Sequence, residues 1–205
     1  MKIHFSPASP FVRKCLAVAH EVGLAGQIQN LPSAANPVNR DASIIVNNPL
    51  GQVPTLLTDD GQALYDSRVI CEYLNDLGGG TLFPAAGPAR WQALADQALA
   101  DGILGAALLA RYENSLRPEA LRWPDWIAGQ MGKVTDALAQ FERRADSFGD
   151  RVDIGTLTLG CALGYLDFRY PDYDWRASQP DCAQWYAVFS ERASMRHTAP
   201  EAPRA

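Results

Sequence analysis

The chain has 205 residues, of which 47% are apolar, so it is long enough for one large domain or two small ones with a substantial core. Its formal net charge is −5 and its basic residues are scattered singly or in pairs, which argues against a nucleic-acid partner. The N-terminus lacks the long apolar core of a signal peptide and no apolar run approaches the length of a membrane span, so we expect a cytoplasmic protein without a membrane partner.

The first predicted elements are a strand and a helix joined by a short turn. Residues 2–5 alternate polar and apolar side chains, as a half-buried strand does, and residues 6–10 read Ser-Pro-Ala-Ser-Pro. Serine is favoured as an N-cap and proline at the first helical position, so Ser9 and Pro10 predict a helix that ends near Gly23. From the residues alone, N-capping is the ordinary role of Ser9.

The next stretch contains the most informative loop of the chain. Residues 27–31 alternate as a second strand, residues 41–46 favour a weak helix, and residues 48–57 read Asn-Pro-Leu-Gly-Gln-Val-Pro-Thr-Leu-Leu, which predicts a loop, a turn and a third strand. Val53-Pro54 is an X-Pro step, the common site of a cis peptide bond. A cis bond would turn the Val53 N–H and C=O outward as an edge for an extended peptide-like ligand. An ordinary turn into a strand is the alternative.

A hairpin and a helix complete a first domain over residues 1–78. Residues 62–65 predict the hairpin partner of the third strand, and Asp66-Ser67 predicts the start of a helix that reaches about Leu77. The order βαβ followed by αββα is that of a thioredoxin-like domain, with a four-stranded mixed sheet and helices on its faces.

A connector rich in glycine and proline follows at residues 79–88, and residues 89–205 carry helical patterns only, which predicts an all-helical second domain. The helices are expected at about 89–113, 123–147, 153–168 and 181–192, with an irregular loop at 172–179. The third of these helices is almost entirely apolar, so we expect it at the centre of the second domain.

The cysteines and histidines give no sign of disulfides or of a metal site. The four cysteines are widely spaced and sit in apolar or helical contexts, which predicts buried thiols: Cys15, Cys71, Cys161 and Cys182. The three histidines have no partner at metal-ligand spacing, so no metal is expected.

Four stretches together make the chain resemble bacterial glutathione S-transferases over its whole length: residues 9–14, residues 48–57, Asp66-Ser67 and residues 160–169. In that family the Val-Pro bond is cis. The resemblance implies glutathione as co-substrate, no metal, and conjugation of glutathione to small hydrophobic electrophiles or reduction of peroxides with it. It also implies a homodimer, for which Gly102 and Gly105 would suit a close interface. A non-catalytic glutathione-binding or interaction protein of the same fold is the alternative, and a glutaredoxin-type reductase acting through Cys15 is a third.

The resemblance assigns Ser9 the role of stabilising the glutathione thiolate. The thiol of glutathione has a pKa near 8.5, so little of it is ionised at neutral pH, and a hydroxyl beside a helix N-terminus would favour the thiolate. Ser6 is the second hydroxyl of this loop and the next candidate. The loop holds neither the tyrosine of other transferase classes nor a cysteine at the Ser9 position, which argues against thiol-disulfide chemistry.

The same resemblance assigns the glutathione-binding residues. The Val53 backbone would pair with the cysteinyl residue of glutathione at an edge shaped by Pro54, and Asp66 and Ser67 would hold the γ-glutamyl end. Gln52 would reach the glycyl end.

Lys14 is a second candidate for the glycyl end. The electrophile site would lie between the domains, lined by Phe11, Leu108, Arg111 and Tyr112. Arg111 would favour an anionic co-substrate there, or it is simply a solvated helix residue.

The resemblance also points to an N-capping box at the start of the third long helix, formed by Asp153 and Thr156. The order of residue types departs from that of the family, and the short Thr156 side chain disfavours the return hydrogen bond.

Overall fold

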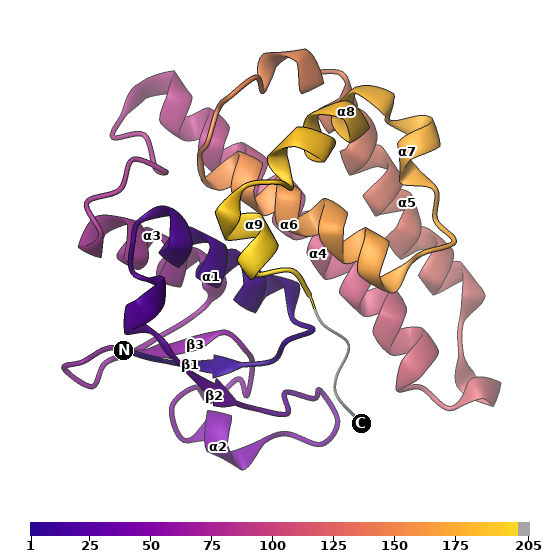
Figure 1. Ribbon diagram of the computed structural model, residues 1–205. Helices are drawn as coiled ribbons and strands as arrows, with labels where there is room; N and C mark the ends of the chain where they lie inside the picture. The colour runs from indigo at the N-terminus through magenta and orange to yellow at the C-terminus, as the bar shows by residue number, and fades with distance from the viewer. Residues whose placement is uncertain (201–205) are drawn as a thin grey trace. The chain divides into compact units, whose positions relative to one another are not determined.

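The computed structural model describes residues 1–200 and divides into two compact units (Figure 1). One unit comprises Met1–Ala85 together with the segment that begins at Ala193, and the other comprises Ala86–Arg192. Of the second domain expected at 89–205, residues 201–205 lie outside the described chain, and the described segment from Ala193 belongs to the first unit.

The first unit is built on a four-stranded mixed sheet, as expected from the sequence. Its strands are β1 (Lys2–Phe5), β2 (Gln29–Pro32), β3 (Thr55–Leu57) and β4 (Ala63–Leu64), in the order β2-β1-β3-β4. β1 runs parallel to β2 and antiparallel to β3, and β3 runs antiparallel to β4. Strand β2 begins later than predicted because Ala25–Gln27 form a 3₁₀ turn.

Helices α1 (Pro10–Glu21) and α3 (Ser67–Leu77) pack together and cover one face of this sheet, whereas α2 (Ala42–Ile45) is a single turn (Figure 1). The core between helices and sheet is formed by fully buried aliphatic side chains, among them Ile3, Val18, Leu56, Ile70 and Leu74. Burial of each such side chain stabilises the fold by about 1.5–3 kcal/mol.

Helix α9 (Ala193–His197) packs on α1 and so returns the end of the described chain to the first unit. The Arg13 guanidinium donates to the Met195 carbonyl at 3.2 Å, and the Ser194 hydroxyl donates to the Glu21 carboxylate. These contacts fasten α9 to the same helix that Ser9 caps.

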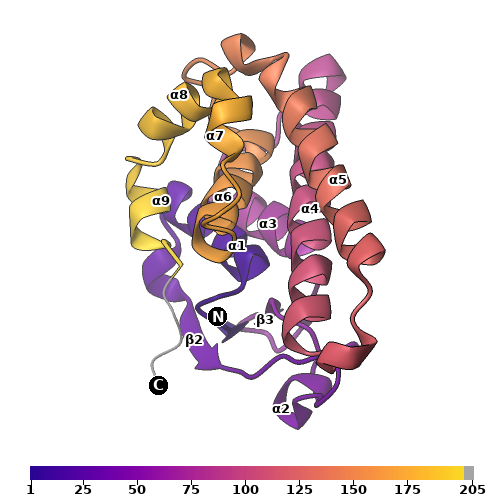
Figure 2. The ribbon, with the colours of Figure 1, turned by 90° about the vertical axis from the view of Figure 1, so that its right-hand side faces the viewer.

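The second unit is all-helical, with α4 (Gly87–Ser115), α5 (Pro124–Glu142), α6 (Ile154–Arg169), α7 (Trp175–Ser178) and α8 (Pro180–Phe189). Helix α4 packs along both α5 and α6 (Figure 2). Every residue from 154 to 166 is buried, which confirms the sequence prediction of a central apolar helix.

Two boundaries in this unit differ from the prediction. The helix expected at 123–147 ends at Glu142, because the chain turns through a 3₁₀ segment (Ala145–Ser147) that buries Phe148. The loop expected at 172–179 contains the short helix α7, which forms because the Asp174 side chain accepts from the Ala177 N–H at 3.2 Å.

The expectation that no apolar run approaches the length of a membrane span is wrong for helix α4. By length and composition alone it is long and apolar enough to cross a bilayer. Of its most apolar window, 56% is buried inside the protein, and the core helix of a globular unit passes the same test.

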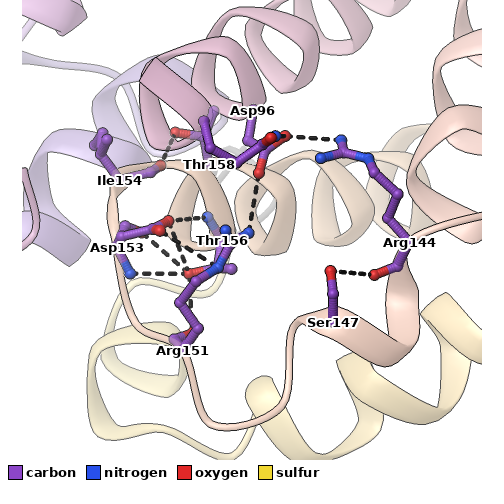
Figure 3. Close-up of polar contacts among 9 residues, drawn as sticks. Asp96, Arg144, Ser147, Arg151, Asp153, Ile154, Thr156 and Thr158 are labelled. Carbon is purple, nitrogen blue, oxygen red and sulfur yellow. Dashed lines mark hydrogen bonds and ion pairs between the residues drawn. The ribbon is translucent and has the colours of Figure 1, made fainter. Parts of the chain in front are cut away.

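A buried carboxylate joins three segments of the helical unit (Figure 3). Asp96 on α4 is 1% exposed and accepts from Arg144 at 2.7 Å and from Arg151 at 2.9 Å. Gly155 packs so closely on the Asp96 side chain that an added Cβ would lie 2.6 Å from the Asp96 Cβ.

The capping box of α6 is complete, so the expectation that the short Thr156 side chain disfavours the return hydrogen bond is wrong. The Asp153 side chain accepts from the Thr156 N–H at 3.0 Å, and the Thr156 hydroxyl accepts from the Asp153 N–H at 3.0 Å. Threonine suffices because both residues are buried, with the hydroxyl held against the backbone.

Candidate functional site

Three loops of the first unit meet at one end of the sheet. The register pairs His4 with Thr55 and Leu56 with Leu64, so the chain leaves β1, enters β3 and leaves β4 at the same end. The loop that contains Ser9 follows β1, the Val53-Pro54 step precedes β3, and Asp66-Ser67 follows β4. The Cys15 thiol donates to the Ser67 carbonyl at 3.7 Å, which ties α1 to the start of α3.

Ser9 is the N-cap of α1 and is half-buried. Its Oγ accepts from the Val12 N–H at 3.3 Å, and its own N–H donates to the Ser6 carbonyl at 3.0 Å. Since Oγ acts there as an acceptor, its hydrogen is available to a further acceptor. Pro10 has no N–H, and within residues 1–200 the Phe11 N–H has no hydrogen-bond partner. The helix start therefore offers two donors.

The Val53–Pro54 peptide bond is cis, and Val53 is half-buried at the start of β3. No other group in residues 1–200 hydrogen-bonds to its N–H or C=O. An extended peptide laid against this step would find a free donor and a free acceptor, as in the addition of a strand to a sheet edge.

Two residues that sequence reasoning did not single out hold this step in place. Asn48 is 1% exposed, and its amide donates to the Thr55 hydroxyl at 2.9 Å and to the Gln52 carbonyl at 3.3 Å. The Thr55 hydroxyl donates to the same carbonyl at 2.9 Å. The sequence signal was an asparagine seven residues before a buried threonine, which only the folded turn brings together.

The start of α3 has the features of an anion-binding helix end. Asp66 is exposed and caps the helix by accepting from the Arg68 N–H at 2.9 Å. Ser67 is 3% exposed, and neither its hydroxyl nor its N–H has a hydrogen-bond partner among the described residues. A free hydroxyl and a free N–H at a helix N-terminus favour a carboxylate. The Tyr65–Asp66 bond that leads into this helix is also cis.

Gln52 and Lys14 differ in their surroundings. The Gln52 side chain is exposed at the turn before Val53. Lys14 is fully buried in α1, with its Nζ 5.9 Å from the centroid of the Phe11 ring. Of the two, Gln52 is the better placed to meet a ligand from solvent.

The residues expected to bind the second substrate belong to two different units. Phe11 lies on α1 of the first unit, whereas Leu108, Arg111 and Tyr112 lie half-buried on α4 of the second unit. Their convergence on one site stays a prediction.

Within the helical unit, the candidate residues Arg111 and Tyr112 have charged and aromatic neighbours on α6 that the sequence did not indicate. Burial raises the pKa of Tyr165 to about 12 and that of Tyr112 above its ordinary value, while the charge of Arg111 opposes both shifts. Burial and then the charge of Arg111 lower the pKa of Arg169. The Tyr170 hydroxyl donates to the Ala107 carbonyl at 2.5 Å, so the end of α6 lies against the turn of α4 that precedes Arg111.

The four cysteines are buried and free of disulfides, which confirms the sequence prediction. Cys15 is fully buried with its Sγ 3.8 Å from that of Cys71, and burial raises the pKa of Cys182 to about 12. The burial of Cys15 makes its thiol poorly accessible, which disfavours a glutaredoxin-type role. Over residues 1–200, no three His, Cys, Asp or Glu side chains converge to hold a metal ion.

Comparison with known proteins identifies the family. The model "Glutathione S-transferase, N-terminal domain" matches residues 8–77, and "Glutathione S-transferase, C-terminal domain" matches residues 124–187. The chain belongs to the glutathione S-transferase family. It is 31% identical over 204 residues to the uncharacterized GST-like protein YibF of Escherichia coli K12, a match that covers 98% of each chain.

Solved structures agree with this assignment. A glutathione transferase family member from Pseudomonas fluorescens Pf-5, crystallised with bound glutathione, is 43% identical with a TM-score of 0.95, over 98% of this chain and 99% of that one. A glutathione S-transferase from Methylobacillus flagellatus KT, also with glutathione bound, is 33% identical with a TM-score of 0.89 over the same shares of the two chains. The fold is that of the family, a thioredoxin-like domain followed by a helical domain.

Proposed function

We propose that the protein is a glutathione transferase that uses Ser9 to stabilise the glutathione thiolate, and that it conjugates glutathione to small hydrophobic electrophiles or reduces peroxides with it. The observation that carries the proposal is the meeting, at one end of the sheet, of the Val53 edge, the Ser67 helix start and the Ser9 hydroxyl. Glutathione presents a peptide backbone, a carboxylate and a thiol, which match these three features in turn.

The binding part of the proposal follows the tripeptide. Its cysteinyl N–H and C=O pair with those of Val53 at the edge shaped by Pro54. The γ-glutamyl carboxylate accepts from the Ser67 hydroxyl and N–H, with Asp66 near the γ-glutamyl ammonium. Gln52 reaches the glycyl carboxylate. The Pseudomonas relative has also been crystallised with S-(propanoic acid)-glutathione, at 42% identity to this chain, which supports a ligand of this class.

The chemical part concerns the thiol. A free thiol has a pKa of about 8.5, and its proton leaves for solvent more readily when the thiolate accepts a hydrogen bond from Ser9 at the positive end of α1. The thiolate then attacks the electrophile and displaces its leaving group. With a peroxide it attacks one oxygen, releases the alcohol and becomes a sulfenic acid, which a second glutathione converts to the disulfide and water.

The proposal also covers assembly and location, as a cytoplasmic homodimer with a role in detoxification. The helical domain would supply the electrophile site. Support for an interface comes from α4, where a Cβ added at Gly102 or Gly105 would meet no heavy atom within 4 Å and where Leu109 is 46% exposed. An apolar face with small residues suits close packing of a second copy.

Steady-state assays with glutathione and a panel of aryl halides and hydroperoxides, together with calorimetric titration of glutathione, test the proposal. We expect micromolar to millimolar binding and saturable turnover with at least one class of second substrate. Tight glutathione binding without turnover would overturn the proposal that the protein is an enzyme and would favour a non-catalytic binding protein of the same fold. Absence of glutathione binding would overturn both.

A further inference from the structure

Two arginines of the helical unit share a cluster that holds no carboxylate. Arg111 lies on α4 and Arg169 is the last residue of α6, and both are half-buried. Among the described residues, no Asp or Glu forms an ion pair with either of them. Other arginines of the unit have acidic partners: Arg144 and Arg151 share Asp96, and Arg176 pairs with Asp167.

The end of α6 is fastened to the turn of α4 that carries Arg111. The Tyr170 hydroxyl donates to the Ala107 carbonyl at 2.5 Å, one helical turn before Arg111. Tyr165 lies one helical turn before Arg169 on α6, and its phenol is buried. The two cations are therefore held together by rigid helices, not by mobile loops.

The cluster leaves hydrogen-bonding capacity unused. The Arg169 Nε is buried without a hydrogen-bond partner, although the guanidinium lies 4.1 Å from the centroid of the Phe168 ring. The Tyr112 hydroxyl has no hydrogen-bond partner among residues 1–200, and burial raises its pKa, so it remains a neutral donor. An unpaired buried donor is unfavourable, and a bound acceptor would satisfy it.

The two positive charges also repel each other. Burial and then the charge of Arg111 lower the pKa of Arg169, and Tyr165 opposes this shift without reversing it. A carboxylate between two guanidiniums would remove the repulsion and accept hydrogen bonds in a planar geometry.

We infer that Arg111 and Arg169, with the Tyr112 hydroxyl, form a subsite for a carboxylate carried by the second substrate. This inference rests on the proposed function, in which the helical domain receives the electrophile, and it narrows the substrate class to acidic electrophiles. Small hydrophobic electrophiles that lack an acidic group would bind without this contact.

The test compares two S-substituted glutathiones that differ only in charge, S-(2-carboxyethyl)glutathione and S-(2-carbamoylethyl)glutathione, by calorimetric titration. We expect the wild-type protein to bind the carboxylate at least about tenfold more tightly, the value of one good charged hydrogen bond. Arg111→Gln and Arg169→Gln should each reduce this preference to within about twofold of unity. Arg143→Gln, which changes an exposed arginine at the C-cap of α5 bonded to Gln140, should leave this preference intact.

Two further measurements separate a binding role from a packing role. Arg111→Lys and Arg169→Lys keep a positive charge and should retain part of the preference, whereas a packing defect would lower the binding of both ligands equally. The affinity of glutathione itself should be unchanged in all variants. Equal affinity of the wild-type protein for the two conjugates, or a preference that survives both glutamine substitutions, overturns the subsite.

A failure of the proposed function gives a different pattern. If no glutathione compound binds, 4-chloro-3-nitrobenzoate and its amide are titrated without glutathione. A preference for the benzoate that Arg111→Gln and Arg169→Gln remove would keep the carboxylate subsite while the glutathione transferase is overturned. Equal binding of benzoate and amide would overturn the subsite as well.

Discussion

Ser9 caps α1, and the proposed function gives it a second role as a donor to sulfur. As an N-cap its oxygen accepts from the Val12 N–H, and as a catalytic donor its hydrogen would meet the glutathione sulfur. An aspartate can cap a helix but cannot donate when ionised, and its charge repels a thiolate. A threonine can do both. The two roles can therefore be tested by different substitutions at one position.

We predict that Ser9→Ala lowers kcat about a hundredfold, the usual loss for one donor to a developing or stabilised anion, with little change in glutathione affinity. It should also lower the free energy of unfolding by about 1 kcal/mol through loss of the cap. Steady-state kinetics, the ultraviolet absorbance of bound thiolate against pH, and urea unfolding measure these effects.

Ser9→Asp and Ser9→Thr are the matched controls. The aspartate variant should be as stable as the wild-type protein yet as inactive as the alanine variant, and the threonine variant should keep both properties. An active Ser9→Asp protein would exclude a donor role for this residue. The hydroxyl of Ser6 would then be tested in the same way.

The structural role of a residue could be predicted where it depends on a short local sequence pattern. The capping preferences of Ser9 before Pro10, and of Asp66 before Ser67, predict the two helix starts that the structure has. The cationic cluster was not visible in the sequence beyond Arg111, because Arg169 ends an apolar run that predicts only a core helix. The position of Arg169 at the end of α6 depends on the contact of the neighbouring Tyr170 with α4, which is a tertiary contact that the sequence does not indicate.

At the scale of elements, the Asp96 network decides how the helical unit is joined. Asp96 lies on α4, Arg144 follows α5, and Arg151 precedes α6, so one carboxylate connects three segments (Figure 3). Gly155 is required beside it, since a side chain there would collide with Asp96.

We predict that Asp96→Asn lowers the free energy of unfolding of the helical unit by about 2 kcal/mol. This is below the loss of about 3–5 kcal/mol for breaking a fully buried pair, because the side chains of Arg144 and Arg151 are 27% and 30% exposed. All five tryptophans lie between residues 91 and 185, so tryptophan emission during urea unfolding reports on this unit.

Asp146→Asn serves as the control, because Asp146 is an exposed residue of the neighbouring 3₁₀ turn. It should shift stability by less than about 0.5 kcal/mol. If the two variants unfold alike, the Asp96 ion pairs contribute nothing beyond an ordinary surface charge.

Helices and strands were predicted well where their ends carry caps and poorly where packing ends them. Proline at the first turn marks the starts of α1, α5 and α8, and all three begin at that proline. The end of α5 at Glu142 has no such signal, because burial of Phe148 turns the chain there. The Thr156 return bond was likewise a matter of burial, which a residue-type rule does not contain.

At the scale of the whole molecule, the division into units departs from sequence order. The segment that begins at Ala193 belongs to the first unit, although it follows the helical unit in the sequence. The hydrogen bond from Arg13 to the Met195 carbonyl, which joins residues 182 positions apart, holds it there. Patterns of capping and periodicity are local, so they predicted a thioredoxin-like and a helical part in the right order but not this return. The contact also places His197 of α9 against His20 of α1, with ring centroids 5.2 Å apart.

This arrangement makes the stability of the molecule depend on pH. Burial lowers the pKa of His4 and, together with the neighbouring His197, that of His20 below the ordinary value of 6.5. The unfolded chain therefore binds more protons than the folded one as the pH falls through 6.5, and stability is lost in that direction. Hydrogen bonds lower the pKa of Asp41, Asp60 and Glu113, which adds a further loss only near pH 4 and below.

We predict that the unfolding temperature, followed by scanning calorimetry, is constant between pH 7 and 8 and falls as the pH is lowered from 6.5 to 5. His20→Asn, which cannot take up the proton, should flatten this fall, whereas His197→Asn should flatten it less because His20 remains buried. Calorimetry is required because the first unit contains no tryptophan within Met1–Ala85. An unfolding temperature that rises on acidification, or a fall of equal size in the His20→Asn variant, would show that proton uptake at His20 does not govern the stability of the first unit.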